Sequence, residues 1–381
     1  MRGALEESAN PSSIYQAGQR AKLSLERARK HVAALIGAAP RELFFTSSGT
    51  ESNNWALRGL LAGQKRKGLP AAPGASAGRA AQAGNHLIIS AIEHPSVSLV
   101  ARRLEADHGV HVSILPVDHE GRVSPAELQR ALRPETVLVS LMLANGEVGT
   151  LQPIAELAAV AREHGALFHT DAIAAAGHVA IDVKALGVDA LSLAASQFYG
   201  PQGAAALFVR EGVRILPLLE GGGQEQGGRS GTEAIAAVIG MGVAAEAASR
   251  DLPGRTARLA ALRDRLREGL SRIDGVRFNG SWTARLPHNI HACADGVTSE
   301  SLVLGLDQAG ISAGLGSACN SKAMRPSHVL KAMGLTDEQA RGALVLTVGV
   351  PTTDEEVAQA IERMPQVIDR LRKVTALTSR A

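Results

Sequence analysis

The sequence predicts an α/β fold in which a mostly parallel central sheet is covered by helices on both faces. Two observations lead to this prediction. Apolar segments typical of strands alternate with segments of helical periodicity through the first half of the chain. The predicted strands are also apolar without interruption, as in "HLIIS" and "TVLVSLMLA", which is typical of strands buried on both faces. The helical segments supply the crossovers that parallel strands require.

The expected elements follow one another in a regular order. The strand in "ELFFTSS" precedes the helix "ESNNWALRGLLAG", "HLIIS" precedes "SVSLVARRLEA", and "VSILPV" precedes "SPAELQRALR". The strand in "TVLVSLMLA" then precedes "PIAELAAVAREHG", and the strands "ALFHTD" and "DALSLAA" follow. Residues 191–210, "LSLAASQFYGPQGAAALFVR", predict a buried strand, a turn at Tyr199-Gly200-Pro201 and a second apolar strand.

Two changes in composition suggest the domain organisation. Residues 65–84 are rich in Ala, Gly and Pro without periodicity, which predicts a flexible surface insertion. After about residue 250 the chain changes to a long Arg-rich amphipathic helix, a short strand region and a C-terminal helix. We therefore expect a large α/β domain at residues 10–252. The smaller α+β domain comprises residues 253–381, and residues 1–9 join it.

Composition excludes several classes of function. The 381 residues carry 40 basic and 37 acidic side chains, so the formal charge of +3 is too balanced for nucleic-acid or membrane binding. The N-terminus "MRGALEESAN" lacks the apolar region of a secretory signal, which favours a cytoplasmic protein. The only two cysteines, Cys293 and Cys319, are expected to be reduced there. No cysteine or histidine spacing predicts a metal site.

Polar residues follow four of the predicted strands. Thr50 lies in the small-residue turn "TSSGTESNN", His94 in "AIEHPSV", Asn145 and Glu147 in "LANGEVGTLQPI", and Asp171 in "HTDA". The turn could hold a phosphate on its amides, or it could be an ordinary helix N-cap. Ligands of open α/β sheets bind beyond the carboxyl ends of the strands, so four such positions together predict a pocket.

A specific resemblance covers nearly the whole chain. The motifs "NPSSIY", "SSGTESNN", "EHPSV", "LANGEVGTLQPI", "HTDA", "FYGP", "GGGQEQGGRSGTE" and "GLGSACNSKAMRPSHVLKAMG" follow, in order, those of the NifS/IscS-like cysteine desulfurases. These are class V, fold-type I enzymes that use pyridoxal phosphate (PLP). The resemblance implies a dimeric fold-type I PLP protein that takes sulfur from L-cysteine, releases alanine and passes the sulfur on as a persulfide.

The resemblance also implies roles for individual residues. Gly49 and Thr50 resemble phosphate contacts, His94 the imidazole stacked on the cofactor ring, and Asp171 the partner of the ring nitrogen. Asn145 resembles a contact of the substrate carboxylate. Thr232 resembles the threonine that reaches the phosphate of the neighbouring subunit, and Cys319 the cysteine that carries the persulfide.

The chain departs from the family where the chemistry is carried out. The Schiff-base lysine that attaches PLP is replaced by Gln197, whose amide is neither a nucleophile nor a useful base. Three neighbouring cofactor contacts are replaced by Ala174, Ala194 and Ser196. The arginine that binds the substrate carboxylate is replaced by Val345, which cannot form a charge-assisted pair.

Neither of the nearby lysines offers a plain replacement. Lys184 precedes the strand in a helical segment, and Lys322 lies three residues after Cys319 in the predicted smaller domain. Family chains also begin with a further strand, similar to "YLDNAATT", where this chain has "MRGALEESA". Either the start codon is misplaced or that segment is absent.

We therefore expect a family member whose desulfurase chemistry is lost or severely weakened, a pseudoenzyme. Three interpretations stay open at this point. The protein could be a non-catalytic or regulatory member, a slow desulfurase with loosely held PLP, or a PLP-independent persulfide carrier in iron–sulfur cluster assembly that uses Cys319. The expected partners are a second copy or an active paralogue in a dimer, and an iron–sulfur scaffold or another sulfur acceptor.

Overall fold

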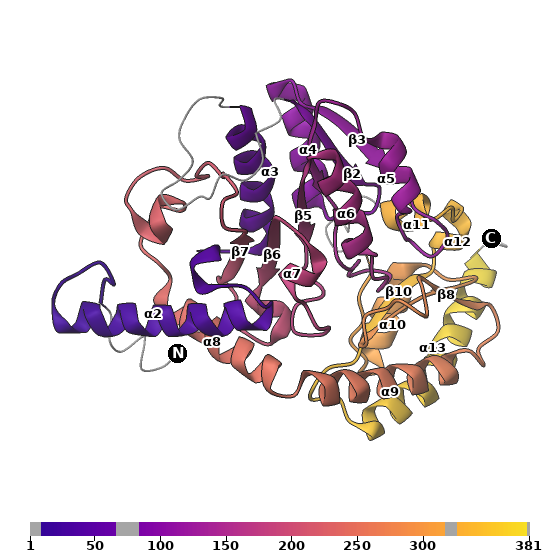
Figure 1. Ribbon diagram of the computed structural model, residues 1–381. Coiled ribbons are helices and arrows are strands. Elements are labelled where there is room, and N and C mark those ends of the chain that lie inside the picture. Colours follow the sequence, from indigo (N-terminus) through magenta and orange to yellow (C-terminus); the bar gives the residue numbers. More distant parts are fainter. Residues whose placement is uncertain (1–8, 66–83, 317–325, 379–381) are drawn as a thin grey trace. The chain divides into compact units, whose positions relative to one another are not determined.

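The computed structural model describes residues 9–65, 84–316 and 326–378. The chain forms two compact units (Figure 1). The first unit comprises the chain up to Leu115 together with Val123–Leu143 and Pro153–Leu252, and the second comprises Pro116–Arg122, Ala144–Gln152 and the chain from Pro253 onward. Nearly all of the predicted insertion at 65–84, and both Cys319 and Lys322, lie outside the described residues.

In the described part of the chain, the first unit is built on a seven-stranded sheet with the order β1-β7-β6-β5-β4-β2-β3. The strands are β1 (Leu43–Thr46), β2 (His86–Ser90), β3 (His111–Leu115), β4 (Thr136–Ser140), β5 (Leu167–Asp171), β6 (Ala190–Ala194) and β7 (Ala205–Val209). Strands β6, β5, β4, β2 and β3 pair in parallel, and β7 is antiparallel to both of its neighbours. The predicted mostly parallel sheet is confirmed.

Helices cover both faces of this sheet, as its sequence predicts. The helices are α2 (Gln16–Leu35), α3 (Gly49–Lys65), α4 (Pro95–His108), α5 (Pro125–Ala131), α6 (Ile154–His164), α7 (Val183–Leu186) and α8 (Ile235–Arg250), with short 3-10 turns η1 (Pro40–Glu42), η2 (Ala195–Phe198) and η3 (Gln224–Gly227). Leu87 and Ile89 of β2 pack in one core cluster with Trp55 of α3. Ile88, between them, is equally buried and points to the opposite face.

The second unit packs helices on a three-stranded antiparallel sheet of order β10-β9-β8. Its elements are α9 (Leu252–Leu270), β8 (Val276–Asn279), β9 (Asn289–Ala294), α10 (Ser299–Gln308), α11 (His328–Ala332), α12 (Asp337–Ala340), β10 (Ala343–Thr347) and α13 (Asp354–Thr378). Leu259, Leu262 and Leu266 recur at helical spacing on α9 and are buried in the core of this unit.

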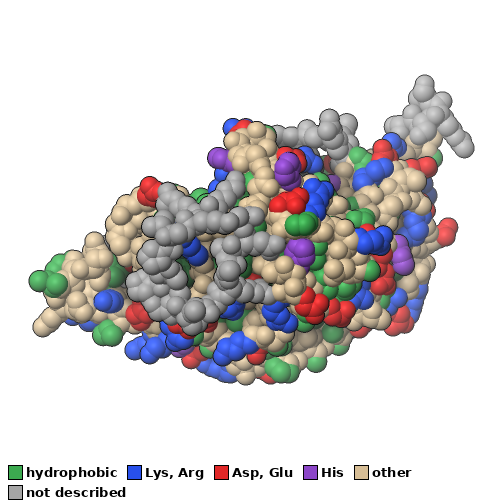
Figure 2. Space-filling view, turned by 45° about the horizontal axis from the view of Figure 1, so that its top comes forward, with side chains coloured by type: hydrophobic (Ala, Val, Ile, Leu, Met, Phe, Trp, Pro, Cys, Tyr) green, Lys and Arg blue, Asp and Glu red, His purple; other side chains and the backbone are tan. Residues whose placement is uncertain are grey.

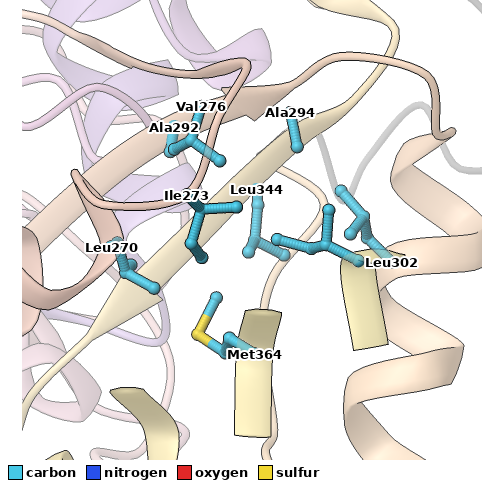
Figure 3. A pocket seen from close by; sticks show the side chains of 9 residues that line it. Leu270, Ile273, Val276, Ala292, Ala294, Leu302, Leu344 and Met364 are labelled. Carbon is cyan, nitrogen blue, oxygen red and sulfur yellow. The ribbon is translucent and has the colours of Figure 1, made fainter. Parts of the chain in front are cut away.

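A small apolar cavity lies in the core of the second unit. Figure 3 shows its lining side chains pointing toward one another from α9, the turn after it, β8, β9, β10, α10 and α13. They are Leu270, Ile273, Val276, Ala292, Ala294, Leu302, Leu344, Met364 and Ile368. The lining offers no polar side chain, so we assign this cavity to packing rather than to chemistry.

Three findings on the described residues bear on the class of protein. No helix among them is both long and apolar enough to cross a membrane. No cluster of three or more His, Cys, Asp or Glu side chains among them could hold a metal ion. On the face drawn in Figure 2, basic and acidic side chains are interspersed rather than separated by sign. That surface has no charged patch of one sign for a polyanionic partner.

Candidate functional site

Several predicted site residues of the first unit gather at one edge of its sheet. Strand β1 is reached through two antiparallel pairings, so it runs in the same direction as β2, β5 and β6. The carboxyl ends of these four strands therefore meet at the same edge. Helix α3 begins just after β1, and α4 just after β2. Two helix N-termini thus lie where an open α/β sheet binds ligands.

The small-residue turn after β1 is tightly packed. Ser48 caps α3, because its Oγ accepts a hydrogen bond from Glu51 N at 3.1 Å. A Cβ added to the buried Gly49 would lie 2.2 Å from Ile173 Cδ1, so a side chain there would require the Ile173 side chain to move. Thr50 is exposed. The first turn of a helix has four amides without intrahelical partners, and one cap leaves amides that could face an anion.

An ion pair neutralises the carboxylate beside this turn. Arg229 Nε lies 2.8 Å from Glu51 Oε1, and both side chains are largely buried. Burial opposes ionisation of Glu51, but the hydrogen bonds from Arg229 and Ser47 outweigh it and lower its pKa. A lone Glu51 charge at a helix N-terminus would repel an anion. Arg229 removes that repulsion and also ties the "RSGT" segment to the "SSGT" turn.

His94 caps the second helix N-terminus of the edge. Its Nδ1 accepts a hydrogen bond from Ser96 N at 3.1 Å and lies 2.7 Å from Ser96 Oγ. The ring remains exposed. An imidazole held only through Nδ1 leaves its flat faces and Nε2 available to a ligand.

Asp171 ends β5 as a buried carboxyl group. Its Oδ1 accepts from Ile173 N at 2.9 Å, and its Oδ2 from Asn53 Nδ2 at 2.7 Å. Burial raises the pKa of Asp171, and these two bonds oppose that rise, as a positive charge on His94 would. Asn53 Nδ2 also donates to Ser96 Oγ at 2.8 Å. We call Asn53, His94, Ser96 and Asp171 the β5 polar network.

The loop that carries Gln197 differs from this network. It is the 3-10 turn η2, which buries Ala195 and Phe198 and exposes the side chains of Ser196 and Gln197. His178 Nε2 donates to the backbone oxygen of Gln197 at 2.8 Å. The backbone of the turn is therefore fixed while the Gln197 side chain faces outward.

Lys184 lies at the opposite edge of the sheet from Gln197. It is an exposed residue of α7, which precedes β6, whereas Gln197 follows β6. A strand rises about 3.3 Å per residue, so the length of β6 separates the two positions. Lys184 cannot reach the position of Gln197.

Thr232 is exposed at the end of a loop that is held by hydrogen bonds between its own residues. Ser230 Oγ donates to Gly222 O at 2.8 Å, and Gly231 N donates to Gln224 Oε1 at 3.2 Å. Glu225 anchors the loop from within through a buried bidentate pair with Arg29. The loop therefore presents Thr232 to the surface from a fixed base.

Asn145 belongs to the second unit, whereas the sheet edge belongs to the first. It is buried, and its Oδ1 accepts from Glu147 N at 2.9 Å and from Val148 N at 3.0 Å. The side-chain oxygen of Asn145 therefore accepts hydrogen bonds from its own loop. Our expectation that Asn145 follows β4 directly is not met, because β4 already ends at Ser140.

Val345, where the resemblance implies an arginine, lies beside a buried carboxyl–imidazole pair of the second unit. Val345 of β10 is half-buried and pairs directly with His291 of β9. His291 Nε2 lies 3.8 Å from Glu147 Oε1. Burial raises the pKa of Glu147 to about 7 and lowers that of His291 to about 3. Cys293, two residues further along β9, is buried, and burial raises its pKa to about 11.

Sequence reasoning missed Asn53, Ser96 and Arg229. The Ser96 contact had a signal, since Pro95 following His94 predicts a helix that starts at Pro95 and an amide at 96 facing the His94 side chain. The contact of Asn53 with Asp171 had none, because it depends on how α3 packs against α4 and β5.

Comparisons with known proteins agree on one family. Residues 4–359 match the family described as aminotransferase class-V. The chain is 43% identical over 373 residues to a protein named cysteine desulfurase IscS from Methanosarcina thermophila, covering 98% of this chain and 88% of that one. It is 41% identical over 375 residues to another of that name from Clostridium botulinum, covering 98% and 90%. A solved NifS-like protein shares the fold with a TM-score of 0.86 and 31% identity, covering 96% of this chain and 93% of that one.

Proposed function

Because the chain belongs to the class-V aminotransferase family and, within it, to the IscS/NifS-like cysteine desulfurases, we propose that it is a degenerate desulfurase of fold type I. It holds PLP without a covalent bond and turns over L-cysteine poorly or not at all. One observation carries this proposal. Asn53, Ser96 and Asp171 of the β5 polar network are buried and linked by hydrogen bonds, while the position at which the resemblance implies the attaching lysine is an exposed Gln197.

The residues of the sheet edge fit the ring and the phosphate of PLP. A buried carboxylate without a positive partner is costly, and a protonated ring nitrogen would supply that partner to Asp171. The amides of Gly49 and Thr50, next to a neutralised Glu51, suit a phosphate group. His94 would hold the ring. When bound, PLP supplies an electron sink for reactions at the α-carbon of an amino acid.

The same edge does not fit covalent attachment or proton transfer. The Gln197 amide cannot form the covalent bond or move a proton at neutral pH. Ala174 and Ala194 offer no polar atoms where the family has cofactor contacts. In the second unit, Val345 leaves a substrate carboxylate without a charge-assisted bidentate partner. The residues of this chain therefore fit PLP binding but not its covalent attachment or the proton transfers of desulfuration.

The proposal extends to assembly and sulfur transfer. An exposed Thr232 on an anchored loop suits the completion of a partner subunit's phosphate pocket, either in a homodimer or in a heterodimer with an active paralogue. The role expected for Cys319 as a persulfide carrier, delivery to an iron–sulfur scaffold and a cytoplasmic location remain part of the proposal. Inheritance of a dimer interface without a present role is the competing explanation for Thr232.

Co-expression with an active paralogue tests the role of Thr232. If this chain completes the paralogue's site, a heterodimer forms and its desulfurase activity falls when this chain carries Thr232→Ala. The exposed Thr283 lies in the second unit and provides the control variant Thr283→Ala. Exclusive self-association, or equal activity of the two variants, would remove the proposal.

A turnover assay tests the proposed function itself. The purified protein is saturated with PLP and supplied with L-cysteine and a thiol reductant, and alanine and sulfide are measured. We expect the protein to release alanine no faster than free PLP does in solution without protein. A rate well above that background, abolished by Asp171→Asn, would identify a working enzyme instead.

A further inference from the structure

The proposed function assigns Asn53 of the β5 polar network no contact with PLP. Asn53 lies on α3, is fully buried, and contacts both Asp171 at the end of β5 and Ser96 in the first turn of α4. We infer that Asn53 is a positioning residue: its amide nitrogen holds the Asp171 carboxylate with one N–H and, through Ser96, the His94 ring with the other. The inference rests on the proposed function, because it concerns how these two residues are set to receive PLP.

The direction of each hydrogen bond in the network can be derived. A backbone N–H only donates, so the bond from Ser96 N shows that His94 Nδ1 is an acceptor. Ser96 Oγ therefore gives its single proton to Nδ1 and accepts from Asn53 Nδ2. The neutral His94 ring then carries its proton on Nε2. Every bond of this arm runs outward from Asn53.

The orientation of the Asn53 amide is fixed by its two neighbours. Amide oxygen and nitrogen are assigned from their surroundings, and here both neighbours of Nδ2 are acceptors. The opposite orientation would place Oδ1 against the Asp171 carboxylate. Among the described residues Oδ1 has no hydrogen-bond partner, so the two donated bonds alone orient the group. The position needs two donors, which Asp or Leu at residue 53 would not supply.

Other charged groups also face Asp171. A positive charge on His94 would lower the pKa of Asp171, and the buried Glu93, next to His94 in the chain, interacts with Asp171 as a like charge. Burial raises the pKa of Asp171, and the bond from Asn53 opposes the rise. A ligand with a protonated ring nitrogen requires the ionised carboxylate, so this bond favours the binding state of Asp171.

The test measures the carboxyl titration of Asp171 in the cofactor-free protein by carbon NMR, with the signal assigned from Asp171→Asn. We expect Asn53→Leu and Asn53→Asp to raise the pKa of Asp171 by about one unit or more. Ser96→Ala breaks only the arm to His94 and should leave the titration nearly unchanged. Asn85→Leu, at the amino end of β2, is the matched control. Unchanged titration in both Asn53 variants would overturn the inference.

A second readout connects this network to PLP. We expect the PLP dissociation constant, titrated by absorbance, to rise about tenfold in Asn53→Leu. The pH below which PLP affinity falls should also move to a higher value. If Asp171 titrates differently but PLP affinity and its pH profile are unchanged, Asn53 does not act toward the cofactor and the inference is wrong. If the unmodified protein binds no PLP, the proposed function fails, while the NMR titration still decides the role of Asn53 toward Asp171.

Discussion

The β5 polar network and the turn η2 follow neighbouring strands of one sheet, yet they are built differently. The network joins α3, α4 and β5 through buried hydrogen bonds, and a single altered residue would leave a buried group unpaired. The side chains of Ser196 and Gln197 on η2 instead face outward, and the turn keeps its shape through Ala195, Phe198 and a backbone bond.

This difference bears on the proposal that Gln197 stands in place of a lysine. Replacement of an exposed lysine costs the fold little, because no packing or buried hydrogen bond depends on the side chain at position 197 in this structure. Replacement within the β5 polar network would cost stability whether or not PLP is bound.

The largest change should come from returning the amine. We expect Gln197→Lys to form a covalent bond with PLP, seen as a mass increase after borohydride reduction, because the position lies just beyond β6 at the ligand edge. Ser196→Lys, one residue away, is the matched control. Absence of any adduct in Gln197→Lys would show that the retained region no longer places PLP.

Turnover should need a second substitution. With Val345 unable to pair with a substrate carboxylate, Gln197→Lys alone should release alanine slowly, and adding Val345→Arg should raise the rate about tenfold or more. Full activity from the single substitution would show that substrate binding does not depend on position 345 of β10.

The buried region should also determine acid stability. His169 of β5 bonds to Ser140 and Ser192, and burial lowers its pKa from 6.5 to about 3. The unfolded chain therefore takes up a proton as the pH falls below 6.5 while the folded protein does not. Stability present above that pH should be lost as the pH falls toward 3, by up to on the order of 4 kcal/mol.

Chemical denaturation across this pH range checks the expectation. His169→Gln, whatever its stability at pH 8, should lose part of the acid-side slope, because His86 and His291, whose pKa burial also lowers, supply the rest. His119→Gln changes an exposed histidine and should keep it. Equal slopes in the two variants would assign the acid sensitivity elsewhere.

The smallest effect should come from the phosphate end of the site. Arg229→Gln leaves the Glu51 charge unneutralised beside the α3 N-terminus, so PLP affinity should fall about fivefold, and less at high salt. Arg210→Gln removes an ion pair with Asp189 at the start of β6 and serves as the control. A loss that does not depend on salt would indicate a change in packing rather than in charge.

Much of the fold could be predicted because it depends on local patterns. A strand such as β2 is apolar at Leu87, Ile88 and Ile89, and only a sheet covered on both faces buries all three. The strand end near Asn145 could not be predicted. Leu141 and Leu143 still bond to β5, so the apolar run continues past Ser140 after the strand has ended.

Within the candidate site, the sequence identified the residues but not their connections. His94 and Asp171 follow predicted strands, and their gathering at one edge follows from parallel pairing. Their link through Asn53 and Ser96 requires the packing of two helices, which no spacing in the sequence encodes. The outward direction of Gln197 likewise depends on the burial of Ala195 and Phe198 beneath η2.

The most direct test of the central claim, that PLP binding is retained while attachment is lost, combines reduction with dialysis on the unmodified protein. The protein is saturated with PLP, and one half is reduced with borohydride before both halves are dialysed. Intact mass and bound PLP are then measured. We expect saturable binding that dialysis removes from both halves, with no covalent adduct. A phosphopyridoxyl-lysine adduct retained through dialysis in the reduced half, or no binding at all, would contradict the account.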